Sequence, residues 1–331
     1  MPEFLKRSIW LLLPLGALGL LLLLNAAMNP RFFHIEYVNG RFAGSIVDVL
    51  RLAAPIMLTA LGMTLVIATG GIDLSVGAIM AMAGSLAAVL LVNFHAPFYL
   101  VIPVALAVCM VAGLWNGLLV ALMKIQPIVA TLILMVAGRG IAQLLTDGQS
   151  IEVKGNAGFS FLGLGTLLGI PVPVWIALAM ALAIAALARL TALGLFIESI
   201  GGNETASRFA GIRVRTIRLA VYVVSGWCAG VAGLIYTSNI TTSDANNAGL
   251  YMELDAILAV VLGGTALTGG RFMLLGSLLG ALIIQTLTTT ILMLQVGGES
   301  IPPEYNLIAK AAVVLAVCLL QRLVFSVLGT D

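Results

Sequence analysis

The sequence predicts an all-α membrane protein that crosses the bilayer many times, and three observations support this. Of the 331 residues, 61% are hydrophobic and only 9% are charged, and the mean hydropathy is +1.14. Soluble domains carry about 25% charged residues, so this chain has too few charges to cover a surface in water. Apolar runs of about 20 residues, the length that spans the hydrocarbon core, recur along the chain. Such runs must be helical, because a helix satisfies its own backbone hydrogen bonds in lipid.

We expect about ten membrane segments. The first apolar run is longer than the roughly 7–15 residues of a signal peptide, so we predict that it is retained as a helix. Spanning helices are predicted at residues 9–28, 47–69, 74–92, 97–123, 127–146, 171–189, 214–238, 270–295 and 304–325. The run ELDAILAVVLG, residues 253–263, is too short to span and is predicted to be a half-helix buried in protein or lining a cavity. No soluble domain or linker interrupts the chain, so residues 1–331 form a single transmembrane domain.

The distribution of arginine and lysine orients these helices. Short cytoplasmic loops carry an excess of both residues. With the N-terminus in the cytoplasm, the inner side collects Lys6, Arg7, Lys124, Arg189, Arg208, Arg213, Arg215, Arg218, Arg271 and Arg322. The outer loops then hold only Arg31, Arg41 and Lys154. We therefore predict that both termini and the loop 194–213 are cytoplasmic.

The polar residues exclude several classes of function. The formal net charge is only +2 and no basic run is present, so no nucleic-acid partner is expected. Cys109, Cys228 and Cys318 lie in apolar patterns without disulfide or metal spacing, so we predict no metal. Both histidines, His34 and His95, lie in outer loops without a serine or metal cluster, so an intramembrane hydrolase lacks a catalytic constellation.

A nucleotide site is also excluded. The stretch GGTALTGGRF places Gly264 and Gly269 at the glycine spacing of a phosphate-binding P-loop. Gly270 and Arg271, however, stand where that motif needs Lys and then Ser or Thr. We predict that the chain has no catalytic residues and does not bind ATP by itself.

The stretch ATGGIDLSVGA, residues 68–78, places one carboxylate inside apolar sequence. Gly70 and Gly71 weaken the preceding helix, and Asp73 is placed to act as N-cap of the next one. Ionisable residues at membrane depth are also candidates for function, so Thr69, Asp73 and Ser75 are predicted to line a pathway. Both interpretations remain open.

Residues 65–80 and 258–273 each contain an apolar helix, a Gly-Gly pair and a second apolar helix. Paired, glycine-interrupted segments in two halves of a chain indicate a transport site, and chance similarity is the alternative.

The outer loop before the half-helix carries a second polar cluster. Asp244, Asn246 and Asn247 precede it, and Glu253 and Asp255 lie in its first turn, where the helix dipole favours negative charge. Amides and carboxylates suit hydrogen bonding to a hydroxyl-rich ligand. An exposed loop with helix caps is the alternative.

Other polar groups lie inside predicted helices. Arg139 is expected to form a structural ion pair with Asp255 or another acid, and the alternative is that its side chain extends outward to the membrane surface. Asn116, Gln143 and Gln285 are expected to hold helices together, with Asn116 also a candidate for the pathway.

The inner loop contains the pattern of a short helix. Asn203 is a favourable N-cap, Glu204 and Arg208 suit the two ends of the dipole, and Gly211 suits the position after the helix. This pattern is consistent with a simple connector between two spanning helices.

Four stretches together resemble the inner-membrane permeases of monosaccharide ABC importers of the ribose, arabinose and xylose type. They are GMTLVIATGGIDLSVGA, GLWNGLLVALMKIQPIVATLILMVAGRGIAQLL, IGGNETASRFAGIRVRTIRLAVYVVSGWCAGVAGLI and ELDAILAVVLGGTALTGGRF. They cover most of the chain in the family's order. Within the family, IQPIVATLILMVAGRG and DANNAGLYMELDAILAVVLGG are most similar to the galactofuranose importer's permease.

The resemblance implies a multi-pass protein of the bacterial inner membrane that alternates access for a monosaccharide. It implies a second permease (identical or, as in galactofuranose-type systems, different), partner ATPases that bind ATP and magnesium, and a periplasmic sugar-binding protein. It also implies that the inner loop holds a coupling helix that docks on the ATPase, formed by Asn203, Glu204, Thr205, Ala206, Ser207, Arg208 and Phe209. The alternative is an ion-coupled secondary transporter with discontinuous helices, in which Asp73 would titrate.

Overall fold

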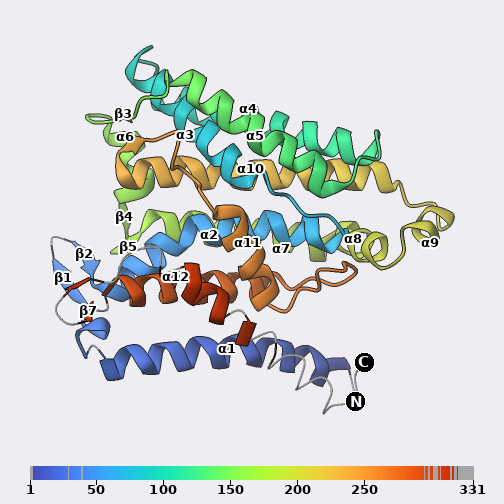
Figure 1. The fold of residues 1–331 in the computed structure, drawn as a ribbon, viewed down its shortest axis with the longest axis horizontal. Helices are drawn as coiled ribbons and strands as arrows, with labels where there is room; N and C mark the ends of the chain where they lie inside the picture. Colours follow the sequence, from blue (N-terminus) through green and yellow to red (C-terminus); the bar gives the residue numbers. More distant parts are fainter. Residues whose placement is uncertain are drawn as a thin grey trace.

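The computed structural model describes residues 3–28, 30–38, 40–293, 295–296, 299–300, 305, 307–313, 315–316 and 319. The long helices are α1 (Glu3–Met28), α2 (Ser45–Ala68), α3 (Val76–Val92), α4 (Phe98–Ala121), α5 (Pro127–Leu145), α7 (Val172–Leu190), α10 (Val214–Ile240) and α12 (Leu274–Met293). Shorter helices are η1 (Pro30–Phe33), α6 (Ala157–Leu164), α8 (Leu193–Gly202), α9 (Glu204–Phe209) and α11 (Met252–Leu262). The helices run side by side as one bundle (Figure 1).

Within the described residues, seven helices are long and apolar enough to cross a membrane, namely α1, α2, α4, α5, α7, α10 and α12. This agrees with the predicted class of all-α polytopic membrane protein. Helix α3 is apolar but has only 17 residues. The predicted last segment, 304–325, lies largely outside the described residues.

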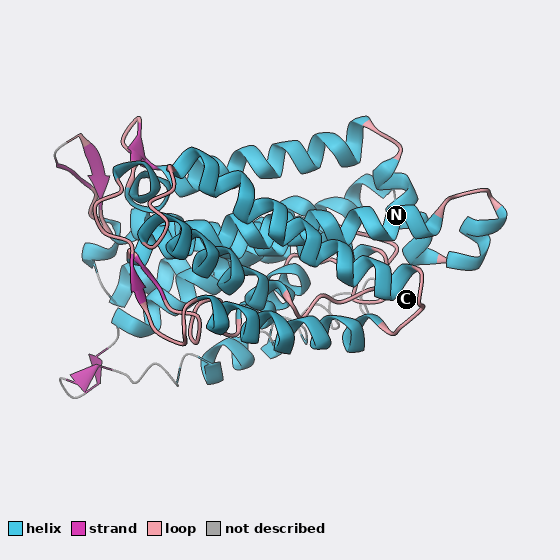
Figure 2. Cartoon of the chain, turned by 90° about the horizontal axis from the view of Figure 1, so that it is seen from above, coloured by secondary structure: helices cyan, strands magenta, loops and turns pink. Residues whose placement is uncertain are grey.

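The short strands lie together at one end of the bundle, opposite α9 and the start of α1 (Figures 1 and 2). They form four antiparallel pairs: β1 (Glu36–Val38) with β2 (Arg41–Ala43), β3 (Ile151–Glu152) with β6 (Thr242–Ser243), β4 (Thr166–Leu167) with β5 (Ile170–Pro171), and β7 (Gln295–Val296) with β8 (Glu299–Ser300). These strand pairs lie in the loops that the charge distribution predicts to be outside.

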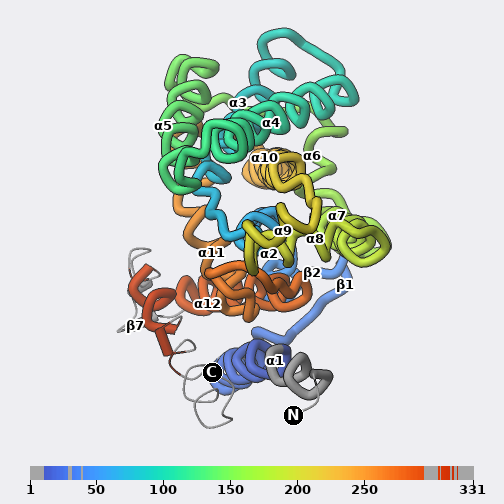
Figure 3. Tube along the Cα trace, turned by 90° about the vertical axis from the view of Figure 1, so that its right-hand side faces the viewer, coloured from blue at the N-terminus to red at the C-terminus, as the bar shows by residue number. Residues whose placement is uncertain are grey.

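Helices α2 and α10 form the centre of the bundle (Figure 3). In α2, 83% of the apolar window is buried within the chain, against 11% in α1, which lies at the periphery beside α12. Helices α10 and α4 approach closely at one glycine pair: a Cβ added to Gly113 would lie 3.2 Å from the Cα of Gly226. Small residues allow such close backbone approach, which favours helix association in lipid.

One predicted boundary is wrong. The sequence predicts a span at residues 270–295, but the helix there, α12, begins at Leu274. Gly269 and Gly270 have φ angles of +85° and +83°, a conformation that ends regular helix and favours glycine. Residues 263–273 therefore form a loop between the half-helix α11 and α12.

Candidate functional site

The break between α2 and α3 forms because Gly70 reverses the chain direction. Its φ angle is +79°, and its N–H donates to the carbonyl oxygen of Ile67 at 2.8 Å. The N–H of Gly71 reaches back to Val66 at 3.1 Å, so the last carbonyls of α2 are satisfied. The chain then runs without helical structure to Ser75, and α3 starts at Val76.

Asp73 is fully buried in this break and its carboxylate is held by hydroxyl and amide groups. Oδ1 accepts from the backbone N–H of Ser75 at 3.0 Å and from its hydroxyl at 2.6 Å. Oδ2 accepts from the hydroxyl of Ser225, on α10, at 2.8 Å. The side-chain amide of Asn116, on α4, donates to Ser75 Oγ at 2.8 Å and lies 3.5 Å from Asp73 Oδ1. Asp73 thus joins three helices at one point.

The expected N-cap assignment needs a correction. The residue that precedes the first helical residue of α3 is Ser75, and its own side chain does not cap the helix. Asp73 instead accepts from the N–H two residues ahead, so it closes the turn that leads into α3. The carboxylate also satisfies a hydroxyl of another helix, a contact that a simple cap does not make.

Three glycine pairs meet beside this break. The N–H of Gly270 donates to the carbonyl oxygen of Ala68, the last residue of α2, at 3.0 Å. A Cβ added to Gly269 would lie 2.9 Å from the backbone nitrogen of Gly70 and 3.1 Å from the Cα of Gly201. A Cβ on Gly201 itself would overlap both Ala68 O and Gly270 N. We call residues 70–71, 201–202 and 269–270 the glycine junction.

The glycine junction bears on the sequence similarity between residues 65–80 and 258–273. The second glycine-rich break folds back on the first, since Gly270 hydrogen-bonds to the end of α2. The two similar segments therefore meet in space. The connection between α7 and α10 also contacts them, through Gly201 and Gly202 at the end of α8.

Helix α9 starts directly after the glycine junction. The Asn203 side chain accepts from the N–H of Ala206 at 2.9 Å, as predicted for an N-cap. Glu204 forms ion pairs with Arg208 on its own helix and with Arg218 on α10, the latter at 2.6 Å. The Ser207 hydroxyl is 2.7 Å from that of Ser199 on α8.

Other side chains of α9 are exposed on the surface of the chain. Thr205, Ala206 and Phe209 are exposed, and Phe209 is 89% exposed. An aromatic side chain held out from a capped helix is typical of a surface that binds another protein.

Asp244, Asn246 and Asn247 form a separate cluster near the strand end of the bundle. The Asp244 carboxylate accepts from the N–H groups of Asn246 and Asn247 and from the Asn247 side chain at 2.7 Å. The hydrogen bond from the Asn247 side chain is the main cause that lowers the pKa of Asp244 below its ordinary value, and the positive charge of Arg139 adds to it. The loop also contacts α5, because the Gln143 amide donates to Asn246 Oδ1 at 2.7 Å.

The prediction that Arg139 pairs with Asp255 is wrong. The Arg139 guanidinium donates to two backbone carbonyl oxygens of the loop between α10 and α11, Ala245 at 3.0 Å and Ala248 at 2.5 Å. It therefore fixes the loop that carries Asp244 rather than an acidic side chain. The fold explains this partner, since the same loop approaches the start of α3, where a Cβ added to Gly77 would overlap the carbonyl oxygen of Gly249.

Asp255 pairs with Lys310 instead, with N–O distances of 2.7 and 2.8 Å. Both side chains are largely buried, and the pair connects α11 to the C-terminal segment. Asp255 is thus occupied by a cation and lies apart from the Asp73 network, while Glu253 is half-buried next to α3.

We expect Lys310→Met to lower the free energy of unfolding by about 3–5 kcal/mol, because it leaves a buried carboxylate without its cation. The matched control is the double variant Asp255→Leu with Lys310→Met, which should recover most of that loss. Thermal unfolding in detergent measures both. Equal stability of the single variant and the parent chain would contradict the pairing.

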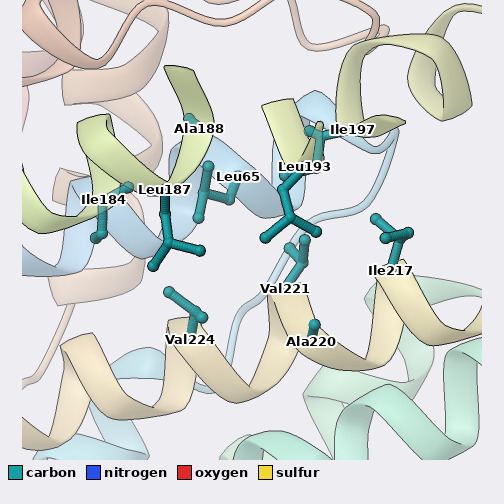
Figure 4. Close-up of a pocket in the computed structure, with 10 residues that line it drawn as sticks. All are labelled: Leu65, Ile184, Leu187, Ala188, Leu193, Ile197, Ile217, Ala220, Val221 and Val224. Atoms are coloured by element: carbon teal, nitrogen blue, oxygen red, sulfur yellow. The ribbon is translucent and has the colours of Figure 1, made fainter. Parts of the chain in front are cut away.

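Two hollows lie near the Asp73 network. The first is an apolar groove of about 50 Å³ between α2, α7, α8 and α10, lined by Leu, Ile, Val and Ala side chains (Figure 4). Its lining side chains are all apolar, so the groove offers no side-chain hydrogen-bond partner for a sugar hydroxyl. The second is a polar cavity of about 340 Å³ between the break, the turn from α4 to α5, α9 and α10.

The sequence interpretation missed several residues of this region. Ser225 and Tyr222 lie one turn apart on α10 and look like ordinary members of an apolar helix. Arg218 is one turn before Tyr222, which places Arg218, Tyr222 and Ser225 on one face. That spacing of polar residues on a spanning helix is the signal that could have found them.

Residues 45–318 match the family model described as "Branched-chain amino acid transport system / permease component". The chain belongs to this permease family. It is 52% identical over 308 residues to the galactofuranose transporter permease of Escherichia coli (strain K12), covering 93% of this chain and 88% of that protein.

Other relatives are also sugar permeases. The fructose import permease of Bifidobacterium longum (strain NCC 2705) is 42% identical, over 85% of this chain and 78% of its own. The ribose import permease of Haemophilus influenzae (strain ATCC 51907 / DSM 11121 / KW20 / Rd) is 40% identical, over 92% and 90%. No solved structure matches the chain. The family resemblance in the sequence is confirmed.

Proposed function

We propose that this chain is the permease subunit of an ATP-driven importer for a monosaccharide, galactofuranose or a similar sugar. The observation that carries the proposal is the 52% identity to a galactofuranose permease along 93% of this chain. The ribose and fructose permeases among the relatives support the wider class of monosaccharides. The break at Asp73 fits a transport function, because interrupted helices form substrate sites in membrane transporters.

We further propose ten membrane segments, with both termini in the cytoplasm of a bacterium and residues 1–331 as one multi-pass domain of the inner membrane. The shared position of α9 and the start of α1 at one end of the bundle supports this arrangement (Figure 1). The inner coupling loop then comprises residues 194–213.

Cysteine labelling tests the topology in a background without the native cysteines. Ala157→Cys and Asn246→Cys lie on exposed residues at the strand end and should react with an impermeant thiol reagent from outside. Thr205→Cys, exposed on α9, should react only after the membrane is opened. Labelling of residue 205 in intact cells would overturn the orientation.

The partners follow from the family. We propose a second permease, identical or different, partner ATPase subunits that bind ATP and magnesium, and a periplasmic sugar-binding protein. The chain itself needs no cofactor and performs no hydrolysis. The purified chain is expected to show no ATPase activity, and activity should appear when the ATPase is added.

Within the chain, we propose that α9 receives the movement of the ATPase and that α10 and the glycine junction carry it to Asp73. Two connections support this. Glu204 binds Arg218, and the same face of α10 continues through Tyr222 to Ser225, which binds the Asp73 carboxylate. The second connection is direct, since Gly201 contacts the end of α2 just before α9 begins.

We propose that Thr69, Asp73, Ser75 and Asn116 belong to the substrate pathway at its inner part, and Asp244, Asn246, Asn247 and Glu253 at its outer part. Their polar groups can exchange hydrogen bonds with sugar hydroxyls. Asp255 is better described as structural, because Lys310 occupies it.

Phe209→Ala is expected to weaken assembly with the ATPase or to lower the sugar imported per ATP hydrolysed, while folding stays intact. The side chain is almost fully exposed, so the isolated chain loses little, whereas a docked aromatic residue contributes about 2 kcal/mol or more to an interface. Glu204→Ala and Arg208→Ala should act in the same direction. Pull-down of the ATPase and uptake in proteoliposomes measure the effect.

The matched control for Phe209→Ala is Leu190→Ala, at the end of α7, a large apolar residue that is also exposed. It should leave assembly and import unchanged. Wild-type assembly, hydrolysis and import in all three α9 variants would show that the coupling helix lies elsewhere.

The identity of the sugar is tested through the partner. The cognate binding protein should gain thermal stability with one monosaccharide, and the complete complex should import that same sugar. Stabilisation of the binding protein by branched-chain amino acids alone, with no response to sugars, would contradict the monosaccharide assignment.

A further inference from the structure

The polar cavity beside α9 has features that transport of a neutral sugar does not explain. Among the described residues, its wall includes the cations Lys124, Arg208 and Arg218 and one acid, Glu204. These four charges sum to +2. The volume of about 340 Å³ lies within the ~300–1,000 Å³ that is usual for small-molecule sites.

The cations come from three separate elements that converge on the cavity. Lys124 is exposed in the turn between α4 and α5. Its φ angle of +57°, in the left-handed region, is part of the backbone conformation of this turn. Arg208 is on α9 and Arg218 on α10, and both share the carboxylate of Glu204. One carboxylate therefore serves two guanidinium groups, which leaves N–H donors of both arginines for another acceptor.

A second observation indicates a missing ligand. Tyr222 lines the same cavity and is 1% exposed, yet its hydroxyl has no hydrogen-bond partner among the described residues. A Cβ on Gly71 would lie 2.8 Å from this hydroxyl, so glycine leaves the group room. A buried hydroxyl without a partner is costly, and a ligand acceptor at the cavity wall would satisfy it.

We propose that this cavity binds the phosphate group of a small cytoplasmic metabolite, of the class of monosaccharide phosphates. A phosphate monoester offers three acceptor oxygens and about two negative charges, which match the excess charge and the donors of Lys124, Arg208, Arg218 and Tyr222. The remaining volume, next to Gln126 and the backbone of Gly70 and Gly71, accommodates the sugar part of the ligand. The proposal rests on the proposed topology in one respect: α9 must face the cytoplasm for a cytoplasmic metabolite to reach the cavity.

Binding would act on α9. The phosphate would compete with Glu204 for Arg208 and Arg218, and so change how α9 is held against α10. The ligand would also connect these arginines to Lys124, on the other side of the cavity. The site is thus placed to regulate import by the phosphorylated sugar that accumulates inside the cell.

The test is thermal unfolding of the purified full chain, titrated at constant ionic strength with glucose 6-phosphate, inorganic phosphate or glucose. We expect saturable stabilisation by glucose 6-phosphate, weaker stabilisation by phosphate, and none by glucose. Lys124→Gln should weaken the apparent affinity about tenfold, as for the loss of one charge-assisted hydrogen bond. Tyr222→Phe should weaken it several-fold while the chain without ligand becomes more stable.

Arg189→Gln, at the cytoplasmic end of α7, is the matched control, because it removes one positive charge outside the cavity. It should leave the affinity unchanged. Equal weakening by Lys124→Gln and Arg189→Gln, or stabilisation that follows ionic strength alone, would overturn the proposal. Stabilisation by nanodiscs of phosphatidylglycerol but not by soluble phosphates would overturn the metabolite as the source and assign the phosphate to a lipid headgroup. The binding measurement needs no import, so its failure is separate from failure of the proposed function.

Discussion

Asp73→Leu is expected to prevent accumulation of the folded chain, whereas Asp73→Asn should fold and retain appreciable import. Leucine removes the acceptor for the N–H and hydroxyl of Ser75 and for the hydroxyl of Ser225. Each buried donor left without a partner costs about 1–3 kcal/mol, and three are lost together. Asparagine keeps one acceptor oxygen for Ser75, and the Ser225 hydroxyl can accept from its amide.

Membrane levels, thermal unfolding and uptake should be measured for both Asp73 variants. Ser75→Ala is a useful control, since it removes one hydroxyl and keeps the carboxylate. If Asp73→Asn folds normally but abolishes import, the charge itself is needed and the structural account of Asp73 is incomplete. If Asp73→Leu accumulates as well as the parent chain, the network contributes little to the fold.

Gly201→Ala is expected to lower import about tenfold or more at matched membrane levels, and Gly202→Ala is expected to be close to the parent chain. The added methyl of Gly201→Ala overlaps the backbone of Ala68 and Gly270, so the glycine junction must separate. Overpacking of this kind costs about 1–3 kcal/mol, and 1.4 kcal/mol is a factor of ten in rate. Within the part of the chain that the structure describes, no atom lies within 4 Å of the corresponding position on Gly202.

Gly201 and Gly202 are the last two residues of α8, so the two alanine variants are matched in helix propensity and in position along the chain. Uptake in cells, with quantification of the chain in the membrane, separates transport from expression. Equal import by the two variants would show that contact at the glycine junction does not matter for transport.

The sequence predicts the long helices well because apolar length is sufficient to define them. The predicted spans 47–69 and 214–238 differ by only one or two residues from α2 and α10. The short helices α6 and α8 and the strands are not visible in hydropathy, since they are set by local turns and by contacts between loops. The predicted start of α12 is too early, because hydropathy does not show that Gly269 and Gly270 adopt positive φ angles, which end regular helix.

The candidate site is predictable only in part. Asp73 is evident because it is a carboxylate inside apolar sequence. Helix α9 is evident because capping and charged residues mark its two ends within a short segment. The partner of Asp73 on α10 is 152 residues away, and no local pattern connects the two. Likewise, charge alone predicts an acidic partner for Arg139, whereas in the fold its guanidinium donates to the carbonyl oxygens of Ala245 and Ala248.

The most direct test of the account is the ratio of sugar imported to ATP hydrolysed, measured in proteoliposomes that contain the complete complex and the binding protein. The parent chain should import only when ATP, the ATPase and the binding protein are all present. Gly201→Ala should keep ATP hydrolysis while the ratio falls, and Gly202→Ala should keep both. Import driven by a proton or sodium gradient without ATP, or an unchanged ratio in Gly201→Ala, would contradict coupling from α9 to Asp73.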